Sequence, residues 1–145
     1  AALKISGVVE RIGDYAKNIA KRVPLLENVG SIEPLSLLPE MARISTEMVH
    51  NVLDAFVERD ADAAVRVCER DQAVDDFYDS IFRTLLTHMM ENPHNIGPSA
   101  HLLFVAKNLE RVGDHATNIA EMVYYAATGD HMADRIKNPV RGKQR

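Results

Sequence analysis

Two ladders of acidic residues are the part of the sequence best suited to chemistry. The ladders comprise Glu110, Asp114 and Asn118 in one segment, and Asp71, Asp75 and Asp79 in another. Because residues four apart on a helix lie above one another about one turn, ~5.4 Å, apart, each ladder would present oxygen atoms along one helix face. Carboxylate and amide oxygens are ligands for hard or borderline cations. Two such ladders on adjacent helices would clamp one or several metal ions.

A solvated acidic face is the simpler interpretation of such a ladder. On that interpretation Arg111 pairs with Asp114 three residues further on, and no ligand is needed. A duplication in the sequence argues against it. The segment VERIGDYAKNIAK at residues 9–21 returns as LERVGDHATNIAE at residues 109–121, an offset of 100 residues. The ladder therefore belongs to a unit that is present twice.

The two copies agree at positions where a helix bundle does not need them to. Their apolar residues drift, from Val9 to Leu109 for example, whereas the polar residues expected to face outward are identical. The identical pairs are Glu10 and Glu110, Arg11 and Arg111, Asp14 and Asp114, and Asn18 and Asn118. Folding needs only the core, so identity on the outer side indicates a binding task. We therefore expect a metal site at each copy, with the two asparagines as possible further ligands.

A glycine lies between the two acids of each copy, at Gly13 and Gly113. Glycine inside a helix costs about 1 kcal/mol relative to alanine. A purely solvated face would gain from alanine, so we expect another backbone or a ligand to approach closely there. His115 takes the place of Tyr15 and is expected to be a packing or surface residue, not a ligand.

Apolar residues spaced three and four apart predict helices along the chain. The apolar seams are Ala2, Ile5, Val9, Ile12, Ala16, Ile19 and Val23 in the first copy, and Leu102, Val105, Leu109, Val112, Ala116, Ile119 and Val123 in the second. Between them we expect a helix over residues 39–59 and a longer one over 61–90, capped by Asp60 and the longest of the fold. The last helix is expected from Pro98 to Gly129.

The predicted fold class is all-α. Residues 39–129 should form an antiparallel three-helix bundle, because short turns join antiparallel neighbours. This bundle is preceded by a single helix over 1–23 and a connector over 24–38. A basic tail over 130–145 has no apolar period and is expected to be disordered.

The motif E-R-[IV]-G-D-x-A-x-N-I-A in two copies resembles the PhoU family, whose fold is two similar three-helix bundles. The resemblance covers the chain except for its tail. It implies that residues 1–23 are the third helix of a first repeat and that residues 39–129 are the whole second repeat. We therefore expect the chain to be a C-terminal fragment that lacks the first two helices.

The resemblance also implies site residues and cofactors. PhoU proteins carry E(D)xxxD motifs on two adjacent helices, and these motifs bind multinuclear clusters of iron or zinc. Carried over by position, one site would be Glu110, Asp114, Asp71 and Asp75, and half of another would be Glu10 and Asp14. The helix pair upstream of residue 1 should have supplied the other half of that second site.

The role implied by the resemblance is regulatory. PhoU proteins act between the ATPase of a phosphate ABC transporter and a membrane-bound sensor histidine kinase, as negative regulators of the phosphate-starvation response. We expect the same cytoplasmic role here, and no enzymatic activity. Di-metal enzymes built on helical bundles direct Glu and E-x-x-H ligands inward, a pattern that this motif lacks. A metal-storage or scaffold protein stays open as the alternative.

Composition limits the partners. The 145 residues are 46% apolar and 26% charged, as in a foldable globular domain, and the net charge of −4 argues against binding to nucleic acid. No run approaches the ~18 apolar residues of a membrane span. The single Cys68 lies in a helical apolar pattern, which favours a buried structural thiol. The apolar seam of the first helix would be exposed in a fragment and predicts a homodimer.

Overall fold

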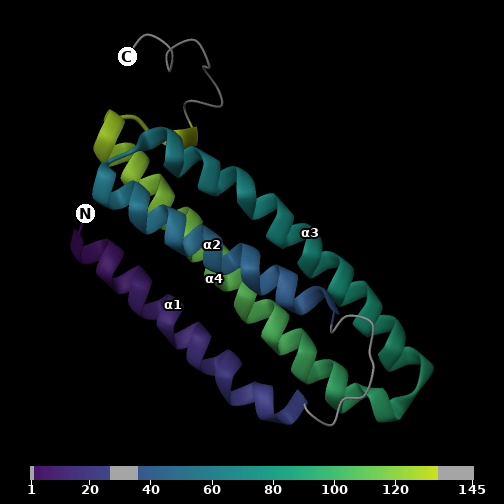
Figure 1. The fold of residues 1–145 in the computed structure, drawn as a ribbon. Coiled ribbons are helices and arrows are strands. Elements are labelled where there is room, and N and C mark those ends of the chain that lie inside the picture. Colours follow the sequence, from purple (N-terminus) through teal and green to yellow (C-terminus); the bar gives the residue numbers. More distant parts are fainter. Residues whose placement is uncertain (1, 27–35, 134–145) are drawn as a thin grey trace.

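The computed structural model describes residues 2–26 and 36–133, which form four long helices and two short 3-10 turns (Figure 1). In chain order these elements are α1 (Ala2–Arg22), η1 (Val23–Leu26), α2 (Leu37–Glu58), α3 (Ala61–Glu91), η3 (Pro93–Asn95) and α4 (Ile96–Thr128). No strand occurs in the described part of the chain. The predicted all-α class is confirmed.

Local sequence signals set the helix ends within two residues of the predicted boundaries. The Asp60 side chain caps α3 by accepting a hydrogen bond of 3.0 Å from the backbone N–H of Ala63. Gly129, with φ at 75°, ends α4 in the left-handed conformation that glycine favours. One expectation is wrong: α4 with 33 residues, and not α3 with 31, is the longest helix. Helix α4 begins at Ile96, before the predicted start at Pro98, because proline is tolerated in the first turn of a helix.

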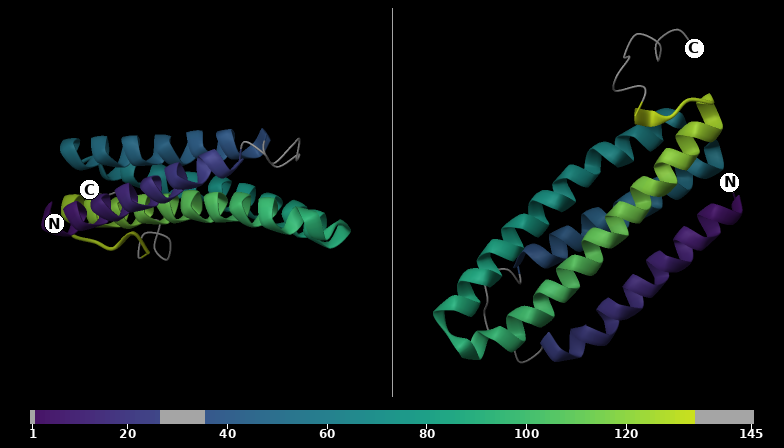
Figure 2. Two further views of the ribbon diagram at one scale, coloured as in Figure 1. Left: turned by 90° about the horizontal axis from the view of Figure 1, so that it is seen from below. Right: turned by 180° about the vertical axis from the view of Figure 1, so that it is seen from behind.

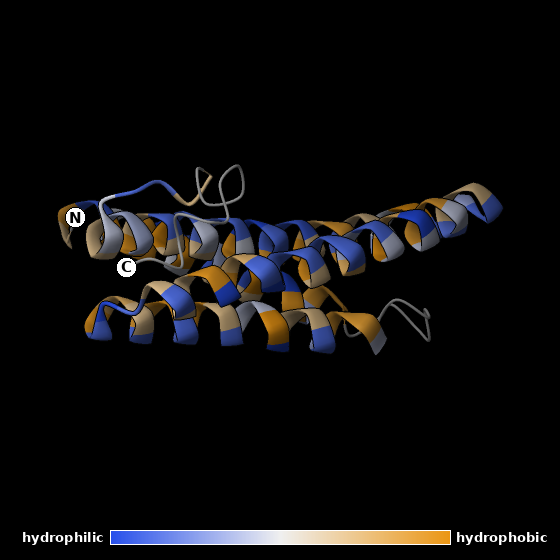
Figure 3. Ribbon diagram, turned by 90° about the horizontal axis from the view of Figure 1, so that it is seen from above, coloured by the Kyte–Doolittle hydropathy of each residue, from blue (hydrophilic) through white to orange (hydrophobic). Residues whose placement is uncertain are grey.

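Helices α2, α3 and α4 form the predicted antiparallel bundle, and α1 lies antiparallel to α4 along its outer side (Figures 1 and 2). Hydrophilic and hydrophobic residues alternate around each helix, as an amphipathic bundle requires (Figure 3). The three bundle helices share one apolar core. Core side chains with at most 1% exposure include Met41, Met48, Val52, Val74, Ile81, Leu85, Leu102 and Ile119.

The packing of α1 differs from the prediction. Of its expected seam only Ile5 is buried, while Val9 and Val23 are 37% and 50% exposed. Ile12 and Ile19 of the seam, and Val8 next to it, pack partly against the common core. The physical reason is that α1 packs mainly against one helix, α4, whereas the equivalent seam of α4 is enclosed by α2 and α3. The strip formed by Val9, Ala16 and Val23 therefore stays open.

The structure describes only part of the predicted connector and of the predicted tail. Residues 27–35 of the predicted connector and 134–145 of the predicted tail lie outside the described residues. Within the tail, Met132 packs against the core, and the rings of His131 and Tyr125 stack with centroids 4.8 Å apart.

Cys68 is half-buried, and burial raises the pKa of its thiol to about 11, which suits a structural role. None of the described helices is long and apolar enough to span a membrane.

Candidate metal centre

Helices α3 and α4 bring three carboxylates together at the rim of their interface. Asp71 and Asp75 lie on successive turns of α3, and Asp114 lies on α4. One oxygen atom from each of the three lies within 4.8 Å of the others. The two ladders inferred from the sequence therefore do meet in space, through three of their members. We call these three residues the carboxylate triad.

Gly113 permits the close approach of the two helices at the triad. A Cβ atom added at Gly113 would lie 3.0 Å from Oδ1 of Asp71 and 3.5 Å from a methyl carbon of Val74. The first distance is tighter than ordinary packing allows, so glycine leaves the room that the Asp71 carboxylate occupies. Gly113 does have a close neighbour, but that neighbour is the Asp71 side chain and not the backbone or ligand that we expected. At Gly13 no atom lies within 4 Å of such a Cβ, so the expectation is not met there.

Asp71 has an oxygen atom without a partner. Its Oδ1 is buried and makes no hydrogen bond within the protein. Buried polar atoms in native proteins almost always have a partner, because an unpaired one keeps the full cost of its desolvation. Asp71 Oδ1 therefore lacks a partner within the protein, and a bound cation would supply one.

Burial and the charges of nearby carboxylates, Glu110 among them, raise the pKa of all three carboxyl groups. Burial is the largest cause for Asp71, whose pKa rises to about 6, and Asp75, Asp114 and Glu110 raise it further. Burial also leads for Asp75 and Asp114, followed by the negative charges of their neighbours. The triad therefore carries its charge at neutral pH at a free-energy cost, which a cation or a proton would relieve.

Glu110 lies beside the triad but has a partner of its own. Its side chain is 15% exposed and accepts a hydrogen bond of 2.5 Å from Nζ of Lys107. The expectation that Glu110 faces outward is wrong, because α3 covers this flank of α4. Lys107 was missed from the sequence, although its position three residues before Glu110 was a sufficient signal for an ion pair. A cation bound by Glu110 would compete with Lys107.

The remaining predicted ligands do not join the triad. Asp79 and Asn118 are exposed, and Asp79 acts on Asp75 only by raising its pKa. On α1, Glu10 and Asp14 are exposed and Asn18 is half-buried. Within the described residues, the carboxylates that come together do not include Asp79, Glu10 or Asp14.

Arg111 does not pair with Asp114, so the solvated-face interpretation lacks its ion pair in the described residues. The Arg111 guanidinium instead lies over the ring of Tyr15, 5.9 Å from its centroid. His115 packs against the same ring and its Nδ1 is 2.8 Å from the carbonyl oxygen of Arg111, in keeping with the predicted packing role.

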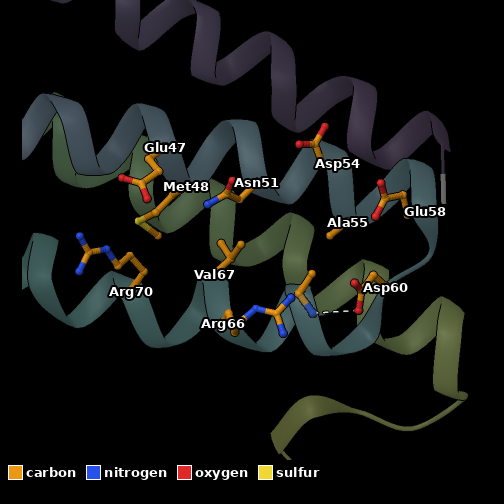
Figure 4. Close-up of a pocket in the computed structure, with 11 residues that line it drawn as sticks. Glu47, Met48, Asn51, Asp54, Ala55, Glu58, Asp60, Arg66, Val67 and Arg70 are labelled. Atoms are coloured by element: carbon orange, nitrogen blue, oxygen red, sulfur yellow. Dashed lines mark hydrogen bonds between the residues drawn. The ribbon is translucent and has the colours of Figure 1, made fainter.

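A separate groove lies between α2 and α3 (Figure 4). Its volume is about 370 Å³, and its charged lining residues are Glu47, Asp54, Glu58, Asp60, Arg66 and Arg70. Three of these acids already have partners, since Asp60 caps α3, Glu47 pairs with Arg43 at 3.0 Å and Asp54 lies 3.5 Å from Nε2 of His50. The groove shares no residue with the triad and is not part of the candidate metal centre.

Comparison with known proteins places this fold. Residues 38–123, which contain α2, α3 and most of α4 with the triad, match the family described as PhoU domain. The chain belongs to the PhoU domain family. This match confirms the resemblance found in the sequence.

PhoU relatives match almost the whole chain. The phosphate-specific transport system accessory protein PhoU homolog of Zymomonas mobilis is 58% identical over 137 residues, covering 94% of this chain and 58% of its own length. The homolog of Caulobacter vibrioides is 46% identical over 136 residues, covering 93% and 59%. This chain thus spans about three-fifths of the length of these relatives. Their names describe a transport accessory protein and not an enzyme, in agreement with our expectation.

Solved PhoU structures share the helical arrangement. The crystal structure of PhoU from Pseudomonas aeruginosa matches with a TM-score of 0.82 and 38% identity, over 88% of this chain and 61% of that one. The PhoU structure from Streptococcus pneumoniae matches with a TM-score of 0.79 and 27% identity. These matches confirm the helical-bundle fold.

Proposed function

We propose that this chain is part of a regulator of phosphate uptake that binds metal ions through Asp71, Asp75 and Asp114. Two observations support the two halves of this proposal. The PhoU relatives are named as accessory proteins of a phosphate-specific transport system. The buried, unpartnered Oδ1 of Asp71, held against Gly113, is the observation that carries the metal site.

The residues present fit a metal ion in two ways. Three carboxylates within 4.8 Å supply enough oxygen donors and negative charge for a cation. Gly113 leaves space for the Asp71 carboxylate, which an alanine would crowd. Glu110 is placed to add a fourth carboxylate if it releases Lys107, so a site for more than one ion is available to this set.

Iron or zinc is the metal that the family resemblance implies. The triad offers oxygen donors alone, without histidine or cysteine. Such a donor set favours hard cations, which makes ferric iron a better match than zinc. A bound ion would supply positive charge that offsets the repulsion among the carboxylates and ties α3 to α4.

In this proposal the protein acts in the cytoplasm as a negative regulator. It would contact the ATPase of the phosphate ABC transporter and a membrane-bound sensor histidine kinase, and would keep the phosphate-starvation response off when phosphate is plentiful. Metal at the triad would stabilise the α3–α4 pair as a rigid surface for these contacts. The alternative is a metal-storage or scaffold protein with the same ligands but no signalling role.

Elemental analysis tests the metal site. Purified protein should carry iron or zinc, and the Glu110→Ala, Asp114→Ala variant should lose most of it. The matched control is Glu10→Ala, Asp14→Ala, which alters the equivalent residues of α1 and should retain the metal. Equal metal content in the wild-type protein and the Glu110→Ala, Asp114→Ala variant would refute the site.

Gene deletion in the source organism separates regulation from storage. Loss of phosphate-dependent repression at unchanged cellular iron and zinc supports the regulator. Altered metal content with repression intact supports storage. A chromosomal Asp114→Asn allele then shows whether repression depends on the triad.

A further inference from the structure

A row of large apolar side chains projects from the second half of α3. Its members are Tyr78, Phe82, Leu86 and Met90, one at every fourth residue, and we call them the α3 ridge. Side chains at this spacing form the type of ridge that fits into the groove of a neighbouring helix. With a rise of about 1.5 Å per residue, the ridge is ~18 Å long, or about three helical turns.

Tyr78 is half-buried against the core, whereas no helix among the described residues covers the last three members of the ridge. Phe82, Leu86 and Met90 are 41%, 46% and 80% exposed. The hairpin formed by α3 and α4 extends beyond the start of α2, which therefore cannot shield its far end (Figures 1 and 2). Ile96, just past the turn of the hairpin, adds another apolar side chain that is 50% exposed.

The composition of the ridge is that of a binding surface. Single exposed apolar residues need no explanation, whereas a contiguous group of them marks an interaction site. Aromatic residues and methionine are enriched where proteins meet. Tyr78 and Phe82 already stack on each other with centroids 6.2 Å apart, which gives the ridge a preorganised aromatic end.

The charges around the ridge define what it would accept. Between residues 75 and 91, α3 carries Asp75, Asp76, Asp79 and Glu91 against a single cation, Arg83. At the aromatic end, Lys107 Nζ lies 5.0 Å from the centroid of Tyr78 but is already bonded to Glu110. The net charge of this stretch of α3 is therefore negative, and a basic occupant complements it.

We infer that the α3 ridge is the docking site for an amphipathic basic helix of a partner protein. The helix would lay a stripe of apolar residues, spaced three and four apart, along Phe82, Leu86 and Met90. Lysine or arginine residues beside that stripe would face Asp79 and, at the aromatic end of the ridge, Asp75. Such helix recognition needs neither a deep pocket nor a metal ion, and a metal ion at the triad would neutralise Asp75 and leave Asp79 as the acidic partner.

A model helix provides the probe. We would titrate a fluorescein-labelled helix of about 18 residues, with leucine on one face and lysine on the other, long enough to span the ridge. A second helix with glutamate in place of lysine tests the charge requirement. Fluorescence anisotropy should show binding of the lysine helix, weakened when salt is raised from about 0.05 to about 0.5 M.

Matched variants locate the binding site. Phe82→Gln with Leu86→Gln should weaken binding of the lysine helix by roughly tenfold or more, because truncating anchor side chains removes most of the interface energy. The control is Val57→Gln with Leu3→Gln, which removes side chains that are 79% and 91% exposed away from the ridge. It should bind as the wild-type protein does. Circular dichroism melts confirm that each variant is folded.

Several results would overturn the inference. Equal affinity of the ridge variant, or equal binding of the glutamate helix, would show that the ridge does not select a basic helix. Vesicles of phosphatidylcholine and phosphatidylglycerol that capture the wild-type protein but not the ridge variant would assign the ridge to a membrane surface. Self-association that disappears in the ridge variant would assign it to a second copy of the chain.

Discussion

Tyr15 and His115, which occupy the same position in the two copies of the motif, meet edge to face with ring centroids 5.1 Å apart. Because α1 and α4 run antiparallel, this contact marks a local two-fold relationship between the two motif helices (Figure 1). Each copy thus turns one side toward the other copy. The opposite side of α4 is buried by α2 and α3, while the opposite side of α1 is open.

The two glycines of the motif provide the first prediction. Gly13→Ala should raise the free energy of unfolding by about 1 kcal/mol, because alanine is the better helix former and nothing lies near its Cβ. Gly113→Ala should gain less or lose stability, because its Cβ would push the Asp71 carboxylate aside. It should also weaken metal binding. Thermal melts and metal titrations of the two variants check both effects, and equal behaviour of the pair would contradict the close contact.

The charge of Asp71 gives a second prediction. Its pKa is raised in the folded protein from 3.8 to about 6, so the folded state holds the proton more tightly than the unfolded state. Stability of the metal-free protein should therefore fall as pH rises from about 4 to about 6, and stay lower above that range. Asp71→Asn should raise the melting temperature at neutral pH and have little effect near pH 4.

The size of the Asp71 effect can be bounded. The whole change in pKa corresponds to about 3 kcal/mol, and solvent screening at the rim of the bundle lowers this to about 1 kcal/mol. Differential scanning calorimetry of the wild-type protein and the variant in chelator, at both pH values, measures it. Added metal should reverse the order at neutral pH, because only the wild-type protein keeps all three ligands. A variant that is less stable in chelator at neutral pH would contradict the raised pKa.

Ala16 and Ala116 occupy equivalent positions in the two copies of the motif and give a third prediction. Ala116 is fully buried on α4, whereas Ala16 is exposed on α1. Ala116→Asp should lower the free energy of unfolding by several kcal/mol, because it buries an unpaired charge. Ala16→Asp should change it by less than about 0.5 kcal/mol, as is usual for the surface. Urea denaturation of both variants shows whether α1 packs against the protein on one side only or is enclosed as α4 is.

The sequence sufficed for what depends on local signals. Helix boundaries followed from caps such as Asp60 and Gly129, and the pairing of the two acidic ladders followed from the spacing of four. Tertiary placement was harder. The spacing of four shows that Glu110 and Asp114 share one face of their helix. It cannot show that α3 packs beside that face and covers Glu110.

The packing of α1 also shows that the sequence does not determine how deeply a helix is buried. Its apolar pattern equals that of α4, so the sequence predicts equal burial for Val9 and Leu109. The structure gives them 37% and 7% exposure. The difference lies in the number of neighbouring helices, which a periodic pattern on one helix does not encode.

Self-association through α1 is the last prediction. The open strip of Val9, Ala16 and Val23 gives two copies of the chain an apolar surface to share around a two-fold axis. The strip is smaller than the sequence predicted, because α4 of the same chain already covers Ile5 and part of Ile12. We therefore expect a weak dimer that forms and dissociates with concentration.

Sedimentation equilibrium over a range of micromolar concentrations measures this dimer. Val9→Lys should render the protein monomeric, because it places a charge within the apolar surface that the two copies would share. Val57→Lys, at a side chain of α2 that is 79% exposed, is the matched control and should dimerise as the wild-type protein does. A dimer that survives Val9→Lys would place the interface elsewhere. A wild-type protein that stays monomeric throughout would show that the α1 strip is too small to hold two copies together.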